Sequence, residues 1–184
     1  FSDYNLILAI QNGSNNIGDA AIEDHSDKNL LVLSQNGKGN DAELWAQDYS
    51  DENIIAVQQN GKRNEVYEAE AYDRSDKNII VAQQNGKGNY AEIRVRYNSD
   101  ENVLLVQQNG KNNYIEYVGV GEKSNSNIVA ARQSGKGNYM YDVYAWEKSD
   151  ENLVIAEQNG KNNYMEYVGA AYSSDKNIIY AGQN

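Results

Sequence analysis

Residues 53–64, Asn-Ile-Ile-Ala-Val-Gln-Gln-Asn-Gly-Lys-Arg-Asn, decide the fold, because near copies of this stretch recur along the whole chain. The block between Asn53 and Gln59 is rich in β-branched side chains, which is typical of a strand. The Asn-Gly-Lys-Arg-Asn that follows supplies residues tolerant of a positive φ angle, which is typical of a turn. The stretch therefore predicts a strand followed by a tight arc.

The Gln-Asn-Gly marker in this stretch gives the period of the repeat. It occurs, once as Gln-Ser-Gly, at Gln11, Gln35, Gln59, Gln84, Gln108, Gln133 and Gln158, and the chain ends with Gln183-Asn184. Successive markers are 24 or 25 residues apart. With the Ser-Asp-x-Asn type of marker that precedes each one, the repeats begin near residues 2, 26, 50, 75, 99, 124 and 149, and a half repeat covers 174–184. Because no linker interrupts the series, residues 1–184 are predicted to form one domain.

A second strand is predicted after each arc. It starts at Asn40, Asn64, Asn89, Asn113, Asn138 and Asn163, and it alternates polar and apolar residues, as in 89–95. The unit is therefore strand, arc, strand, arc, with neither a helical pattern nor a long loop. This predicts an all-β fold, a β-solenoid of about 7.5 rungs whose strands form two parallel cross-β sheets.

Side-chain parity predicts which residues face inward, because successive side chains of a strand point to opposite sides. The Asn and Gln at the two ends of the first strand, six residues apart, share a face with the second and fourth residues between them. Stacking of the rungs would place identical amides above one another, where they can hydrogen-bond along the axis. The predicted inward amide ladders are Asn5, Asn29, Asn53, Asn78, Asn102, Asn127, Asn152 and Asn177; Gln11, Gln35, Gln59, Gln84, Gln108, Gln133, Gln158 and Gln183; and Asn16, Asn40, Asn64, Asn89, Asn113, Asn138 and Asn163. The arc glycines are Gly13, Gly37, Gly61, Gly86, Gly110, Gly135 and Gly160.

The difference between 24-residue and 25-residue copies has a predicted cause in the second strand. In 24-residue copies the inward series continues through small or branched apolar residues, such as Leu44 and Ala46. In 25-residue copies the positions that should face inward are instead occupied by charged residues, such as Glu68 and Glu70. Shifting the inward series by one residue restores apolar side chains at these positions. We therefore expect the extra residue to form a β-bulge between the second and fifth positions of the second strand.

One copy alone is not expected to fold, because its few inward apolar groups do not offset the entropy of ordering about 24 residues. Stacked copies leave an open sheet edge at each end, and the sequence shows no cap there, so both edges are interpreted as joining surfaces. The predicted polymerisation edges are Asn5, Leu6, Ile7 and Leu8 at one end and Asn177, Ile178, Ile179 and Tyr180 at the other. The first strand occurs eight times and the second seven, so a junction must stagger or skip one strand.

The outward positions of the first strand are unexpectedly apolar for a water-facing surface. We interpret them as a lateral face covered by a neighbouring fibre, with simple β-propensity as the alternative; this face comprises Ile54, Ala56, Ile79, Val81, Val103, Leu105, Leu153 and Ile155.

A column of stacked tyrosines is predicted outward on the second strand, at Tyr90, Tyr114, Tyr139 and Tyr164. A column of aspartates on one arc could attract Ca²⁺, but a solvated, charge-balanced arc is the simpler interpretation.

Composition excludes several classes of function. The chain of 184 residues has a net charge of −11, which argues against nucleic acid or an anionic membrane surface as its partner. It has no cysteine and one histidine, and its repeat never breaks around a cleft, so we expect neither a catalytic site, nor a metal site, nor a cofactor. Its apolar runs are too short to insert into a membrane as a helix.

Residues 35–40, Gln-Asn-Gly-Lys-Gly-Asn, preceded six residues earlier by Asn29, give the pattern Gln-x-Gly-x-x-Asn that recurs in phase along essentially the whole chain. This pattern resembles the repeat of curlins, the secreted subunits of curli amyloid fibres, although the copies here are a few residues longer. The resemblance implies a left-handed coil, a secreted, cell-surface fibre of a biofilm matrix, export through an outer-membrane secretion pore, and nucleation by a minor subunit.

The leading hypothesis is a self-assembling structural subunit that polymerises with itself, head to tail, into an extracellular fibre that serves adhesion. The alternative from another class is a soluble β-solenoid binding module for a carbohydrate or an ice surface. Ice binding favours a flat array of small hydroxyl groups, commonly from threonine, and this chain contains no threonine. An enzyme, such as a solenoid polysaccharide lyase, is the third and weakest hypothesis.

Overall fold

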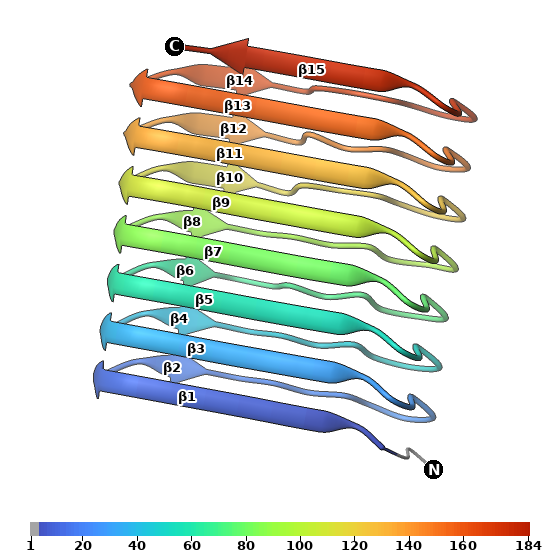
Figure 1. The fold of residues 1–184 in the computed structure, drawn as a ribbon, viewed down its shortest axis with the longest axis horizontal. Coiled ribbons are helices and arrows are strands. Elements are labelled where there is room, and N and C mark those ends of the chain that lie inside the picture. The colour runs from blue at the N-terminus through green and yellow to red at the C-terminus, as the bar shows by residue number, and fades with distance from the viewer. Residues whose placement is uncertain (1–3) are drawn as a thin grey trace.

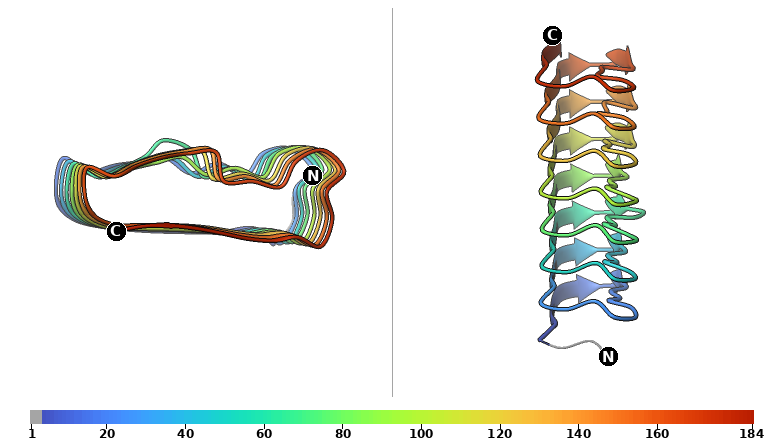
Figure 2. Two further views of the ribbon diagram at one scale, coloured as in Figure 1. Left: turned by 90° about the horizontal axis from the view of Figure 1, so that it is seen from above. Right: turned by 90° about the vertical axis from the view of Figure 1, so that its right-hand side faces the viewer.

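The computed structural model describes residues 4–184 and consists of flat coils stacked directly above one another (Figures 1 and 2). Every regular element in the described residues is a β-strand, as the repeat predicts, and the fold is a β-solenoid with two parallel sheets. Followed from the N-terminus, the chain runs clockwise as it rises toward the viewer of the top view in Figure 2, so the coil is left-handed. The start of the first repeat, near residue 2, lies outside the described residues.

The first sheet contains the long strand of each coil. Its eight strands follow one another in chain order: β1 (Leu6–Ser14), β3 (Leu30–Lys38), β5 (Ile54–Lys62), β7 (Ile79–Lys87), β9 (Val103–Lys111), β11 (Ile128–Lys136), β13 (Leu153–Lys161) and β15 (Ile178–Gln183). The register is in phase throughout, so that Gln35 lies beside Gln59 and Gly37 beside Gly61. This register holds across both 24-residue and 25-residue copies, because the first strand and its arc have the same length in each.

The second sheet is narrower and lies opposite the first. Its seven strands are β2 (Ile17–Gly18), β4 (Asp41–Ala42), β6 (Glu65–Val66), β8 (Tyr90–Ala91), β10 (Tyr114–Glu116), β12 (Tyr139–Tyr141) and β14 (Tyr164–Glu166). Each begins one residue after its Asn, as the sequence predicts, but the long second strand expected from residues 89–95 is wrong, since regular pairing ends after two or three residues. Beyond that point, residues with positive φ, such as Ala46 and Arg96, turn the backbone out of strand geometry.

The core lies between the two sheets and follows the predicted parity. In the first sheet, buried and more exposed residues alternate, as in β3, where Leu31, Leu33 and Gln35 are buried. On the opposite side, Leu44 and Ala46 are buried in a 24-residue copy, and the one-residue shift brings Ala69 and Ala71 into the core of a 25-residue copy. The predicted position of the extra residue is therefore confirmed.

A single left-handed residue accommodates the extra residue in three of the four longer copies. Tyr117, Asp142 and Tyr167 each stand four residues after the Asn that starts the second strand, and each has a positive φ of 50–69°. The residue after each of them, such as Val118 and Val143, then points into the core. The local conformation thus reverses the parity that an uninterrupted strand would keep.

The arc glycines form a column in which only glycine fits. From Gly13 to Gly135 their φ angles are 111–128°, a region that side chains disfavour. A Cβ atom on any of these residues would overlap the carbonyl oxygen of the glycine in the next coil. The close backbone approach and the positive φ both follow from stacking one arc directly on another.

We predict that Gly37→Ala lowers the free energy of unfolding by about 2–4 kcal/mol, because it combines a strained φ of +128° with a clash against the backbone of Gly61. The matched control is Gly39→Ala on the same arc. Gly39 has a φ of +64°, and a Cβ built on it makes only ordinary contacts, at 3.9 Å from Arg63 and from Asn15, which hold the same place in the neighbouring coils. The control should lower this free energy by about 1 kcal/mol or less. Urea denaturation of the monomer measures both; equal losses would contradict the stacking explanation.

Candidate functional site

The Asn column at the start of the first strands forms a continuous ladder. The side-chain Oδ1 of each Asn accepts the backbone N–H of the Asn in the following coil at 2.8–2.9 Å. In most coils the side-chain Nδ2 of that following Asn donates to the same oxygen at 3.0–3.3 Å. From Asn29 to Asn152 these side chains are buried, and the ladder provides the partners that buried amides require, except for the Nδ2 of Asn53, which has none among the described residues.

The Gln column joins neighbouring coils and also joins the two sheets. Each Nε2 donates to Oε1 of the Gln in the next coil at 2.6–2.9 Å. The same Nε2 donates across the core to a backbone carbonyl of the second sheet, for example from Gln84 to Glu65 at 2.8 Å. The column therefore has a fixed direction, with the donor of every amide pointing toward the C-terminal end of the stack.

The second Asn column closes the arcs. The backbone N–H of each Asn from Asn40 to Asn163 donates to Oδ1 of the Asn in the preceding coil at 3.1–3.3 Å. Each Nδ2 also donates to the carbonyl four residues earlier in its own coil, as Asn89 does to Asn85 at 3.2 Å. All three predicted amide ladders are thus present in the described structure.

A fourth ladder, made of serines, is absent from the sequence-based prediction. The Oγ atoms of Ser26, Ser50, Ser75, Ser99, Ser124 and Ser149 accept the backbone N–H of the next Ser at 3.0–3.3 Å. Each Oγ also donates to a carbonyl at the end of the second-sheet path, for example from Ser99 to Gly121 at 2.8 Å. The strict recurrence of Ser three residues before Asn was the available signal. Simple parity hides it, because the residue just before each Asn, such as Lys28, has a positive φ.

The Asp column on the same arc accepts hydrogen bonds from the backbone. Oδ1 of Asp51 accepts the N–H of Asp27 at 2.6 Å, and Asp76 does the same for Asp51 at 2.7 Å. Among residues 4–184 the structure contains no group of three or more His, Cys, Asp or Glu side chains arranged to hold a metal ion. The backbone bonds to the Oδ1 atoms of Asp51 and Asp76 help to fix the stacking of the arcs.

The two ends of the stack present unpaired strand edges. Within residues 4–184, strand β1 pairs only with β3 and β15 only with β13, and every residue of β1 is exposed. The apolar side chains predicted as polymerisation edges are largely in solvent, with Leu6 58% exposed and Ile178 82% exposed. Asn5 and Ile179 are half-buried, whereas Ile7, Leu8, Asn177 and Tyr180 are exposed.

The predicted lateral face is also open in the single chain. Ile54 is 39% exposed and Ile79 is 38% exposed, and the remaining outward residues of this face in β5, β7, β9 and β13 are half-buried against their neighbours in adjacent strands. The predicted Tyr column is present on the opposite sheet, where the rings from Tyr90 to Tyr164 stack at centroid distances of 4.6–5.3 Å and within 8° of parallel. Both faces repeat at the spacing of the strands.

A buried charged cluster lies on the outer side of the second sheet path. Glu70 is only 5% exposed, and its carboxylate lies 3.7 Å from the guanidinium of Arg96. Arg94 contacts both Glu92 and Glu68, the latter at 3.4 Å. Burial raises the pKa of the Glu70 carboxyl from 4.5 to about 8, against the opposing attraction of Arg96. The predicted one-residue shift placed Glu70 away from the core, and the sequence gave no sign of this burial.

Comparisons of the chain with models of known protein families, with curated proteins and with solved structures find no match in any of the three. No helix that could cross a membrane is found in residues 4–184.

We predict that Gln84→Ala lowers the free energy of unfolding by about 2–4 kcal/mol, because it removes a buried link between coils and leaves its hydrogen-bond partners unsatisfied. Gln83→Ala is the matched control, since Gln83 is the adjacent residue and its ladder bond to Gln58 is exposed. The control should change this free energy by about 0.5 kcal/mol or less. Thermal and urea unfolding measure both variants, and equal effects would contradict the structural importance of the buried ladder.

We predict that Glu70→Gln removes a pH-dependent loss of stability. Between about pH 4.5 and pH 8 the folded chain keeps a proton on Glu70 that the unfolded chain releases, so the free energy of unfolding falls as the pH rises through this range. Glu70→Gln should raise that free energy by about 2–4 kcal/mol at pH 8.5 and change it little at pH 4. Urea unfolding across this pH range tests the effect. Glu52→Gln, on an exposed arc, is the control; an identical pH profile for wild type and Glu70→Gln would contradict the assignment.

Proposed function

We propose that this protein is a structural subunit that polymerises with itself, head to tail, into a curli-like amyloid fibre outside the cell. The observation that carries the proposal is the direction of the side-chain ladders. At the N-terminal end of the stack, Oε1 of Gln11 accepts no bond from the described residues, and at the other end Nε2 of Gln183 donates none to them. The two ends of one molecule therefore carry complementary hydrogen-bonding groups.

The backbone edges are complementary in the same direction. The N–H of Leu6 donates to Asn29 in the strand above, and alternate residues of a parallel strand point to the same side, so the N–H groups of Ile7 and Ala9 face the open edge. The N–H of Leu153 donates upward to Asn177, so the in-register β15 residues Ile178 and Tyr180 direct their N–H groups to the opposite open edge. Exposed edges of this length are templates for another strand.

The contact between molecules is proposed to form through the first sheet. There β15 of one molecule would lie beside β1 of the next, which would continue both the amide ladders and the apolar columns. The lateral face of outward Ile, Val, Leu and Ala side chains would pair such fibres side by side.

The setting of the proposed fibre comes from the curlin-like repeat. On that basis we propose a secreted protein of a biofilm matrix that serves adhesion, with a minor nucleating subunit and an outer-membrane secretion pore as further partners. A soluble solenoid that binds a carbohydrate or ice surface is the competing function. It differs in one measurable property, since it should stay monomeric at high concentration.

We predict that fresh monomer forms sedimentable, thioflavin-positive fibres, and that Ala9→Pro and Tyr180→Pro each stop this assembly. Proline removes one edge N–H and is tolerated on edge strands, so each variant should stay folded with one blocked end. Each contact needs one N-terminal and one C-terminal edge, so an equimolar mixture of the two variants should form heterodimers and nothing longer.

Sedimentation, thioflavin fluorescence, electron microscopy and analytical ultracentrifugation test this prediction, with circular dichroism to check the fold of each variant. Wild-type protein that stays monomeric for days without thioflavin response would favour the soluble binding module. Folded variants that polymerise like wild type would overturn the end-to-end contact through β1 and β15.

A further inference from the structure

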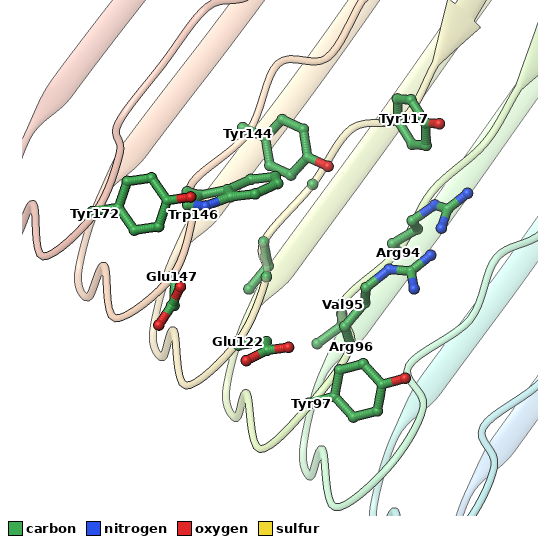
Figure 3. Close-up of a pocket in the computed structure, with 13 residues that line it drawn as sticks. Arg94, Val95, Arg96, Tyr97, Tyr117, Glu122, Tyr144, Trp146, Glu147 and Tyr172 are labelled. Carbon is green, nitrogen blue, oxygen red and sulfur yellow. The ribbon is translucent and has the colours of Figure 1, made fainter.

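A hollow of about 420 Å³ lies on the outer face of the second sheet path, on the side opposite the long strands (Figure 3). Its floor is Gly119 and Gly121 in the coil that contains β10. One wall is formed by Arg94 and Arg96 of the preceding coil and the other by Tyr144 and Trp146 of the following coil. The volume is in the range of sites that hold small organic ligands.

The hollow exists because one coil lacks outward side chains where its neighbours carry large ones. Ser75, Ser99 and Ser124 of the serine ladder each donate to a carbonyl at the same place in successive coils, which are those of Arg96, Gly121 and Trp146. The neighbouring outward column runs through Arg94, Gly119 and Tyr144, and a Cβ on Gly119 would lie 2.7 Å from Cα of Tyr144. With glycine at these two positions, the coil places no side chain between the arginines of one neighbour and the rings of the other.

The aromatic wall is built from rings that hold one another in place. Tyr144 packs edge-to-face on Trp146 at a centroid distance of 4.6 Å and an angle of 70°. Trp146 meets Tyr172 at 6.1 Å and 73°. These side chains project toward the solvent side of the ribbon (Figure 3), and Tyr172 is 66% exposed. They offer apolar ring surface at a low conformational cost, because each ring has few rotatable bonds.

The opposite wall holds polar groups in fixed positions. The guanidinium of Arg94 lies over the ring of Tyr117 at 4.7 Å from its centroid and contacts the carboxylates of Glu68 and Glu92. Its side chain is 18% exposed, and its Nε is buried without a hydrogen-bond partner among the described residues. Arg96 is held by Glu70 at 3.7 Å. Planar donors are therefore positioned in advance of any ligand.

The charges of the hollow select a neutral ligand. Two arginines and two glutamates, Glu122 and Glu147, line it, and the arginines are themselves paired with Glu68, Glu92 and Glu70, so the hollow has no excess of positive charge. An anion would meet these glutamates and a chain of net charge −11, while a cation would meet Arg94 and Arg96. A saccharide carries apolar C–H faces that pack on aromatic rings and hydroxyl groups that pair with guanidinium and carboxylate groups.

We propose that this hollow is a binding site for a neutral oligosaccharide, with Trp146, Tyr144 and Tyr172 as the stacking surface and Arg94 and Arg96 as hydrogen-bond donors. The site lies on the side of the stack, away from the β1 and β15 edges. Its occupation therefore does not depend on the proposed polymerisation and can be measured on the monomer.

The experiment uses Trp45→Phe, in which Trp146 is the only remaining tryptophan. Fluorescence of monomeric protein is titrated with hexamers of β-1,4-linked glucose and of N-acetylglucosamine. Hexamers of galacturonate and of glucosamine serve as anionic and cationic probes. We expect a saturable change in Trp146 emission with at least one neutral hexamer, and weaker binding of both charged probes.

Isothermal titration calorimetry on otherwise wild-type protein then compares Trp146→Ala with Tyr164→Ala. Tyr164 is an exposed tyrosine outside the hollow and serves as the matched control. Trp146→Ala should weaken binding by about tenfold or more, while the control leaves it unchanged. Tyr172→Ala, at the exposed rim, is the second variant if Trp146→Ala does not fold, and about threefold weaker binding is expected.

Absence of saturable binding by either neutral hexamer at millimolar concentration would overturn the proposal. Tighter binding of a charged probe would also overturn it, as would unchanged affinity in a folded Trp146→Ala variant. Because every measurement is made on monomer, failure of this site and failure of fibre formation are separate results.

Discussion

The structure depends on one constraint, which is that amide side chains buried between two sheets must find hydrogen-bond partners. Nearly all Asn and Gln side chains of the ladders meet this need through the same residue one coil away, as Gln84 does through Gln108 at 2.8 Å, and the Nδ2 of Asn53 is the exception within the described ladders. An unsatisfied buried amide costs about 1–3 kcal/mol, so a slip of register would be penalised in every coil. The in-phase pairing of the long strands, the glycine column and the constant length of the first arc all follow from this requirement.

The need to satisfy buried amides restricts which residues can occupy the interior and the arcs. It does not restrict some of the outward-facing positions. On the first sheet most of these positions are apolar, as at Ile54 and Ile79, although Gln58, Arg132 and Glu157 are polar. On the irregular path beyond the second strands they differ from coil to coil, where Arg94, Gly119 and Tyr144 occupy one column. The side chains that differ from coil to coil therefore lie on that outer surface. This is where the surface of the otherwise regular stack varies along its axis.

The two proposed properties of the molecule use different parts of it. Assembly would use the ends of the stack, where the direction of the ladders makes one edge the complement of the other. Ligand binding would use the side, in a hollow bounded by coils whose order within the chain is fixed. In a head-to-tail polymer the hollow would recur once in each subunit, so a long saccharide could contact several equivalent sites and gain avidity.

The sequence by itself determined the parallel stack, the inward amide columns and the one-residue shift that brings Ala69 and Ala71 into the core, because side-chain parity and strict periodicity are local properties of the chain. Parity fails where a residue with positive φ reverses it, which is why the Ser26 column, the short second strands and the burial of Glu70 were decided only by the tertiary structure. The hollow over Gly119 and Gly121 likewise depends on side chains from successive coils, separated by about 25 residues in sequence, that only stacking brings into contact.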